Sequence, residues 1–146
     1  PCMFAVAMGI SRVLYGKFGE KLNIANYIIF CACLCMASYL LAGLSSNSFL
    51  SLLGCVLCGF SVGVMWPGVL SMAAVKCPQG GTALFALLAF TGDIGCFVGP
   101  NTAAAVSSRF AIGGSALKAG LLSCVLFPAV MILCTYMLKA MKTRKE

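Results

Sequence analysis

Residues 24–44 contain no charged side chain and almost no strongly polar one. Crossing the hydrocarbon core of a bilayer, about 30 Å thick, takes about 20 apolar residues in an α-helix. A run of this length and character is therefore predicted to be a helix that crosses a membrane.

Four further apolar segments flank this run, separated by short polar breaks. The five predicted spans cover residues 1–15, 24–44, 49–75, 83–107 and 119–138. None alternates apolar and polar residues with the period of two that a barrel strand requires, and all are too long for such a strand. We therefore predict an all-α, polytopic bundle of five transmembrane helices.

The composition excludes a water-soluble domain. Hydrophobic residues make up 62% of the chain and charged residues only 9%, whereas soluble domains carry about 25% charged residues. The sequence also has no His, no second acid near Asp93, and neither an H-E-x-x-H nor a G-x-S-x-G motif. We therefore expect no catalytic residues and no enzyme activity.

Two prolines predict irregular helices. The segment 49–75 would be about 40 Å long as a straight helix, which exceeds the core of a bilayer, so it must tilt, protrude or break. Pro67 lacks a backbone donor and is the predicted kink point. Pro128 lies near the middle of the last segment and predicts a second bend there.

Basic residues predict the orientation. Five crossings place the breaks at 16–23 and 76–82 and the tail at 139–146 on one side of the membrane. That side carries most of the basic residues outside the spans: Lys17, Lys21, Lys76, Lys139, Lys142, Arg144 and Lys145. The other side carries Arg109 and Lys118. The positive-inside rule then makes the C-terminus and its basic tail cytoplasmic, and the dispersed charges do not form a nucleic-acid groove.

The ten cysteines are predicted to be packing residues. Cys55 and Cys58 have a redox-like spacing, and Cys31, Cys33 and Cys35 look metal-like in isolation. On a helix, however, residues spaced by two and four do not converge on one ion, and no His is available as a further ligand. Free Cys packs as a small apolar residue, so we expect no metal and no cofactor.

Small residues recur at a spacing of four in two spans. Gly59 and Gly63 form one such stripe, and Gly95 and Gly99 form the other, which Ala103 extends. Such stripes allow helix backbones to approach closely in lipid. The stripes suit helices that bend or slide during a conformational cycle, and they suit static close packing equally well.

Asp93 is the most informative polar residue, because it lies near the middle of the segment 83–107. An Asp at the bilayer centre costs about 3 kcal/mol on insertion scales, and such residues are usually functional. In one interpretation Asp93 faces an aqueous cavity and loads and releases a proton. In the other it hydrogen-bonds a neighbouring helix or caps a break at Gly92.

Other polar residues of the spans have functional and structural interpretations. The Trp66 ring is suited to stacking on a sugar or another substrate, or to packing beside Pro67. Asn101 is either a cavity residue or a repair for the carbonyl that Pro100 frees. Ser61 and Thr91 are cavity candidates that also bond readily to their own helix. We expect the Arg12 side chain to extend to the cytoplasmic surface or to pair with Glu20.

The order of these motifs resembles the C-terminal part of a major facilitator superfamily transporter. Gly16, Glu20 and Lys21 match the loop signature G-x-L-x-[DE]-[KR]-x-G of that family, whereas Asn23 stands where Gly is usual. Three further stretches resemble the tenth and eleventh helices of a bacterial, sugar-permease-like branch: Trp66-Pro67-Gly68, Gly80-Gly81-Thr82 and the run from Gly92 to Pro100.

The resemblance implies that the chain corresponds to helices eight to twelve of a twelve-helix protein in a bacterial inner membrane. It makes the segment with Arg12, Gly16, Glu20 and Lys21 a cytoplasmic gating loop, and it also allows the Gly92–Asp93 pair to hold a bend. The start inside an apolar run, without an initiator Met, agrees with a longer natural protein. The missing N-terminal half would then be a partner of this chain.

We therefore expect secondary active transport of a small solute by alternating access, coupled to protons. In such a transporter the first, third and fourth spans border the central cavity, and the second and fifth are peripheral and face lipid. The alternative is a five-helix membrane module without transport activity, such as an assembly factor or an oligomeric, channel-like protein.

Overall fold

The computed structural model describes residues 2–19, 23–110 and 116–143. Its helices are α1 (Cys2–Phe18), α2 (Ile24–Leu44), α3 (Ser48–Lys76), α4 (Gly81–Arg109), α5 (Ala116–Ser123) and α6 (Leu126–Thr143). The residues so described contain no strand, which confirms the predicted all-α class.

The turns that separate α2, α3 and α4 have clear local causes. Asn47 caps the start of α3, where its side-chain oxygen accepts a hydrogen bond from the Phe49 N–H at 3.2 Å. At the other end of α3, the Gly80 N–H donates to the Cys77 carbonyl at 2.9 Å. Gly81 then has a φ of +52°, a conformation that suits glycine. The polar breaks predicted near these positions are present.

The last predicted span, 119–138, is not one continuous helix. Pro128 has no N–H to donate to the Cys124 carbonyl four residues earlier, and that carbonyl instead accepts from the Phe127 N–H at 3.2 Å. The Val125 N–H likewise bonds three residues back, to Leu122 at 3.2 Å. The helix therefore divides into α5 and α6 at Cys124 and Val125, one turn before the proline at which we expected the bend.

Four apolar stretches are long enough to cross a membrane: Ile24–Leu44, Ser48–Lys76, Gly81–Arg109 and Ala116–Ala140. The helix α1 has 17 residues, and whether it crosses the membrane as expected stays a prediction. The described residues thus support a membrane-embedded helical bundle that contains four stretches long enough to span.

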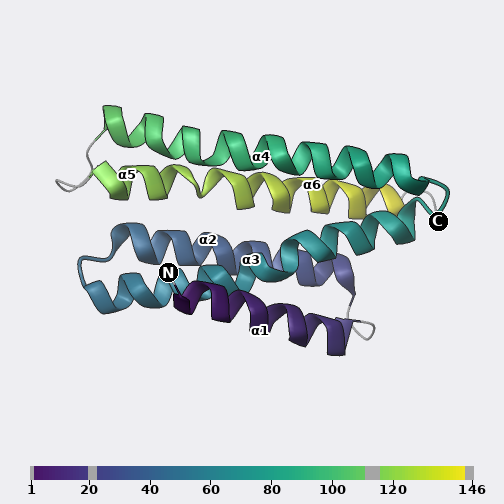
Figure 1. Cartoon of the computed structure of the whole chain (residues 1–146), viewed down its shortest axis with the longest axis horizontal. Coiled ribbons are helices and arrows are strands. Elements are labelled where there is room, and N and C mark those ends of the chain that lie inside the picture. Colours follow the sequence, from purple (N-terminus) through teal and green to yellow (C-terminus); the bar gives the residue numbers. More distant parts are fainter. Residues whose placement is uncertain (1, 20–22, 111–115, 144–146) are drawn as a thin grey trace.

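The helices alternate in direction (Figure 1), so the end of α1, the start of α2, the α3–α4 turn and the end of α6 share one end of the bundle. Two lysines connect helices at this end. The Lys139 ammonium donates to Asn26 Oδ1 of α2 at 2.8 Å, and the Lys76 ammonium donates to the Leu138 carbonyl of α6 at 3.4 Å. The helix α3 continues through Pro67 (Figure 1), and its C-terminal part turns toward α6.

The centre of the bundle is α2, which packs against α3, α5 and α6. Ile28, Cys31, Ala32, Cys35 and Ser38 of α2 are buried. The expectation that residues 24–44 form a peripheral helix is therefore wrong for this bundle. Because most of these buried side chains are small, neighbouring helices approach α2 from two sides.

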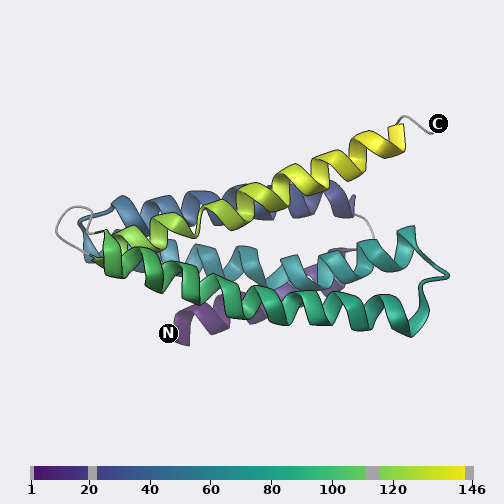
Figure 2. The same ribbon diagram turned by 90° about the horizontal axis from the view of Figure 1, so that it is seen from above.

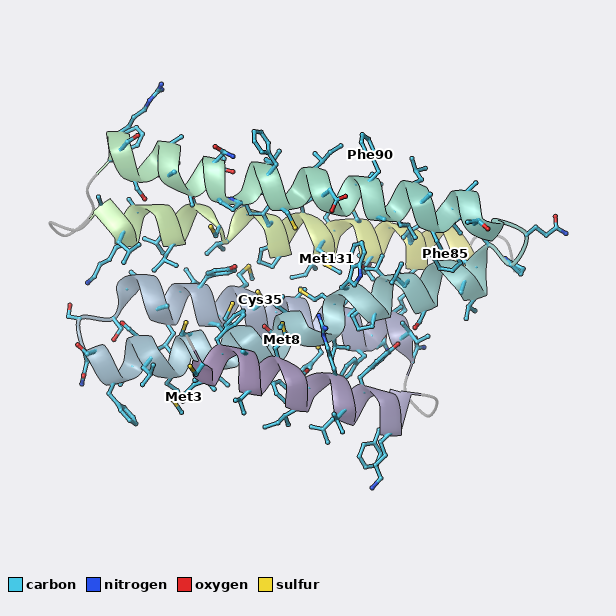
Figure 3. All side chains as sticks on the ribbon, in the orientation of Figure 1. Met3, Met8, Cys35, Phe85, Phe90 and Met131 are labelled. Carbon is cyan, nitrogen blue, oxygen red and sulfur yellow. The ribbon has the colours of Figure 1, made fainter. Side chains whose placement is uncertain are left out.

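The helix α4 is the most exposed helix of the described bundle, since none of its residues is buried. It packs mainly on α5, where Gly120 lies against Ala103 and Ser107. Seen from above, α4 and α6 diverge toward the end of α6 (Figure 2). In Figure 3 the ring of Phe90, which is 62% exposed, points away from the other helices. Most of the α4 surface is thus free within the described chain.

Candidate functional site

Trp66 of α3 contacts Gly92 of α4, the residue that precedes Asp93. The edge of the Trp66 ring lies on the Gly92 backbone, because a Cβ atom placed on Gly92 would be only 2.7 Å from Trp66 Cη2. The ring is still 43% exposed. The structure therefore places an accessible aromatic side chain of α3 beside the turn of α4 that carries Asp93.

Asp93 itself is exposed and lies near the middle of the 29-residue helix α4. It has no hydrogen bond or ion pair with any residue in the described ranges. The helix is also continuous through Gly92, so there is no break for Asp93 to cap. The structural interpretation of Asp93 requires a hydrogen-bonding partner or a helix break, and neither is present in the described chain.

Other polar side chains of α4 bond to their own helix, including three near Asp93 and Pro100. The Thr91 hydroxyl donates to the Leu88 carbonyl at 2.9 Å, and the Thr102 hydroxyl donates to the Val98 carbonyl. The Asn101 amide donates to the Phe97 carbonyl at 2.6 Å. Bonds of this kind satisfy the side chain locally. Asn101 and Thr91 are exposed, but nothing in these bonds brings them to Trp66.

Ser61 lies in a different part of the bundle from Asp93. It is fully buried, and its hydroxyl donates to the Cys58 carbonyl at 2.9 Å. The structure therefore does not bring this cavity candidate together with the α4 residues.

A small space of about 170 Å³ lies where α6 faces α2 and α3. It is lined by Cys35, Tyr39, Val62, Met65, Phe127, Pro128 and Met131, and Figure 3 labels Cys35 and Met131 in this region. Its lining is almost wholly apolar. No group of three or more His, Cys, Asp or Glu residues suited to a metal ion occurs in the described part of the chain.

The two glycine stripes have different surroundings. A Cβ atom on Gly59 would lie 2.5 Å from the Phe4 carbonyl oxygen, and one on Gly63 would lie 2.7 Å from the Met8 carbonyl oxygen. The first stripe is therefore the seam along which α1 contacts α3. Around Gly95 and Gly99, in contrast, a Cβ atom would meet nothing within 4 Å.

Arg12 is exposed and contacts α3, and its extension to the cytoplasmic surface stays a prediction. Its Nε–H donates sideways to the Gly63 carbonyl of α3 at 3.2 Å. The sequence carried a signal for this contact that our reasoning missed, because Pro67 follows Gly63 by four residues. A proline at that spacing deprives the carbonyl of its normal helical donor.

Of the predicted gating loop, Glu20 and Lys21 lie outside the described residues, as does the end of the basic tail at 144–146. Gly16 lies beside a space of about 240 Å³ that Tyr15, Gly19, Ile24 and Ser71 also line. The Tyr15 ring stacks on the Tyr27 ring, with centroids 6.0 Å apart. The described end of α1 thus contacts the start of α2 through aromatic rings.

Within the described ranges, these features support a membrane-embedded helical bundle in which Asp93 has no partner and lies on the most exposed helix. Searches of protein-family models, curated proteins and solved structures find no match to this chain.

Proposed function

We propose that this chain belongs to a secondary active transporter that moves a small solute by alternating access, coupled to protons. In this proposal it supplies helices eight to twelve of a transporter of the major facilitator type, and an N-terminal half completes the cavity. The observation that carries the proposal is Asp93, an acid at the middle of a spanning helix with no hydrogen bond or ion pair in the described ranges.

The physical argument starts from the cost of that acid. A carboxyl group facing lipid at the middle of a bilayer costs about 3 kcal/mol on insertion scales, so intramembrane acids face other protein or a water-filled path. Since no residue of α4 is buried in the described chain, the covering protein or the water path lies on the free side of α4. An acid in that position can take up a proton from one side and release it to the other.

The neighbouring aromatic ring supports binding of a solute at the same place. Trp66 is held against Gly92 and keeps 43% of its surface exposed. Aromatic faces bind the apolar faces of sugars and other ring compounds. A solute bound there would lie next to the proton-carrying group, which is the arrangement that coupling requires.

We propose a bacterial inner membrane as the location, with the C-terminus in the cytoplasm. Lys17, Lys76 and Lys139 lie near helix ends that share one end of the bundle. By the positive-inside rule, the end with the excess of Lys and Arg faces the cytoplasm.

The test uses the complete protein in proteoliposomes with an imposed pH gradient and a panel of sugars, nucleosides and drugs. We expect Asp93→Asn to lose gradient-driven accumulation while still exchanging solute across the membrane, because the amide cannot carry a proton. Ser108→Ala is the control on the same helix, because the Ser108 hydroxyl bonds to the Ala105 carbonyl near the end of α4, and it should accumulate solute like the unmodified protein. Accumulation by Asp93→Asn equal to that of the unmodified protein would refute the proton-coupling role. Absence of transport for the whole panel by the unmodified protein would favour the module without transport activity.

A further inference from the structure

The helix α3 contains a defect in its hydrogen-bond ladder that a second helix repairs. In an α-helix the carbonyl of each residue accepts from the N–H four residues later. Pro67 has no N–H, so the Gly63 carbonyl loses its donor. In a membrane an unsatisfied backbone carbonyl is costly, because no water is available to replace the donor. The Arg12 Nε–H of α1 lies 3.2 Å from that same carbonyl oxygen.

We propose that Arg12 is a latch that supplies the missing donor and thereby fixes α1 to the proline site of α3. The hydrogen bond is charge-assisted, and such bonds are stronger than those between neutral groups. While the bond is in place, α1 and the two halves of α3 move as one body. When it is released, α3 bends at Pro67 independently of α1.

The glycine stripe makes the latch possible. Gly63 has no side chain, so α1 comes close enough for a Cβ atom at this position to lie 2.7 Å from the Met8 carbonyl oxygen. Arg12 follows Met8 by one turn and therefore points along the same seam. The glycine thus removes the obstacle between the two backbones at the position where the proline removes the donor.

Arginine is suited to this role for two reasons. Its Nε–H lies on the side of the stem and can bond laterally, while the remaining N–H groups of the guanidinium stay free for the polar boundary of the membrane. The group also stays charged under all ordinary conditions.

The second intrahelical proline provides an internal comparison. Pro100 removes the helical donor of the Cys96 carbonyl in α4 in the same way. No side chain of α1, α2 or α3 donates to an α4 carbonyl within the described ranges. Within the described ranges, the proline inside α3 is therefore latched and the proline inside α4 is not. This inference rests on the α1–α3 contact alone and does not depend on the proposed transport.

A double-mutant cycle tests the latch. Arg12→Met removes the donor, and Pro67→Ala restores the N–H that Arg12 replaces. Equilibrium unfolding of the full chain is followed by far-UV circular dichroism in mixed detergent micelles. We expect Arg12→Met to raise the unfolding equilibrium constant about tenfold with Pro67 present, as for the loss of one charge-assisted hydrogen bond. With Pro67→Ala the same substitution should change the constant by less than about threefold, since the carbonyl is satisfied within its helix.

Pro100→Ala is the matched control, because it restores a donor where no latch is present. In that background Arg12→Met should keep its full tenfold effect. If Arg12→Met does not fold, Pro67→Ala should rescue folding and Pro100→Ala should not. An equal effect of Arg12→Met with Pro67 present and in the Pro67→Ala background would overturn the proposal, as would rescue by both alanine substitutions.

Trp66 gives an independent readout, since it is the only Trp of the chain and precedes Pro67. Loss of the latch should shift its emission in the folded state, whereas Arg109→Met at the end of α4 should leave the emission unchanged. An unchanged Trp66 emission in Arg12→Met would count against the latch.

Discussion

Replacing Gly59 by alanine tests whether the α1–α3 seam holds this bundle together. A Cβ atom at this position would lie 2.5 Å from the Phe4 carbonyl oxygen and 2.9 Å from Phe4 Cδ2, whereas an ordinary contact begins at 3.4 Å. The nearest atom belongs to the backbone and cannot rotate away. The helix α1 would therefore have to move by about 1 Å, which would also loosen its contact at Gly63.

The expected magnitude follows from two opposing effects. Overpacking of this kind costs about 1–3 kcal/mol. Alanine is favoured over glycine inside a helix by up to about 1 kcal/mol. The net expectation for Gly59→Ala is a loss of about 1–2 kcal/mol in the free energy of unfolding.

Gly95→Ala is the matched control, because Gly95 belongs to a stripe of the same spacing but a Cβ atom there meets nothing within 4 Å. Only the gain in helix propensity remains, so this variant should be as stable as the unmodified chain or more stable by up to about 1 kcal/mol. The two variants should thus differ by about 2 kcal/mol, or about 30-fold in the unfolding equilibrium constant, in detergent unfolding followed by circular dichroism. Equal stability of the two variants would refute the assignment of the seam.

Two further substitutions probe single polar side chains. Asn47→Ala removes the cap at the start of α3, where Asn47 Oδ1 accepts from the Phe49 N–H. This variant should lower the free energy of unfolding by about 1 kcal/mol. An unchanged unfolding midpoint would show that the cap does not contribute. The Ser11 hydroxyl is fully buried and finds no partner in the described part of the chain. Ser11→Ala should therefore stabilise the protein by about 1 kcal/mol in the same assay, and a destabilised variant would show that the hydroxyl is bonded to a group outside the described ranges.

The helix boundaries were largely predictable, because local sequence determines them. The charge-free run 24–44 coincides with α2, and the segments 49–75 and 83–107 lie within α3 and α4. Asn47 and the Gly80–Gly81 pair stop or start helices by bonding to the backbone or by adopting a conformation that suits glycine. These effects act over a few residues and leave a direct mark on the sequence.

The packing of the helices could not be predicted in the same way. An apolar helix in lipid carries no contrast between a buried and an exposed side, because lipid and protein interior are about equally apolar. Apolarity alone therefore does not distinguish residues 24–44 from 83–107, and the family resemblance placed the first of these segments at the periphery. In the structure α2 is the centre of the bundle and α4 has no buried residue. The break at Cys124 and the Arg12 bond to Gly63 both follow from proline chemistry, but the second also needed the position of another helix.

The candidate site was predictable only in part, for the same reason. The cost of an acid in a bilayer singled out Asp93 whatever its neighbours were. Ser61 and Trp66 lie on one helix, but Ser61 is fully buried while Trp66 reaches Gly92 of α4. Which of the two side chains contacts the turn of α4 next to Asp93 depends on how far α3 is rotated about its axis. The spacing of polar residues alone does not specify that rotation.

A comparison of the two glycine stripes bears on what would cover α4 in the proposed transporter. The stripe at Gly59 and Gly63 is occupied by α1, which shows that close backbone contacts within this chain use such a motif. The stripe at Gly95 and Gly99 is of the same kind but open, and it lies on the helix that carries Asp93. A seam of this type stabilises only when a second backbone fills it. Asp93 points about 120–160° away from this stripe around the axis of α4, at about 100° per residue. In the proposed transporter the N-terminal half therefore fills the stripe, and the acid faces a different side of α4.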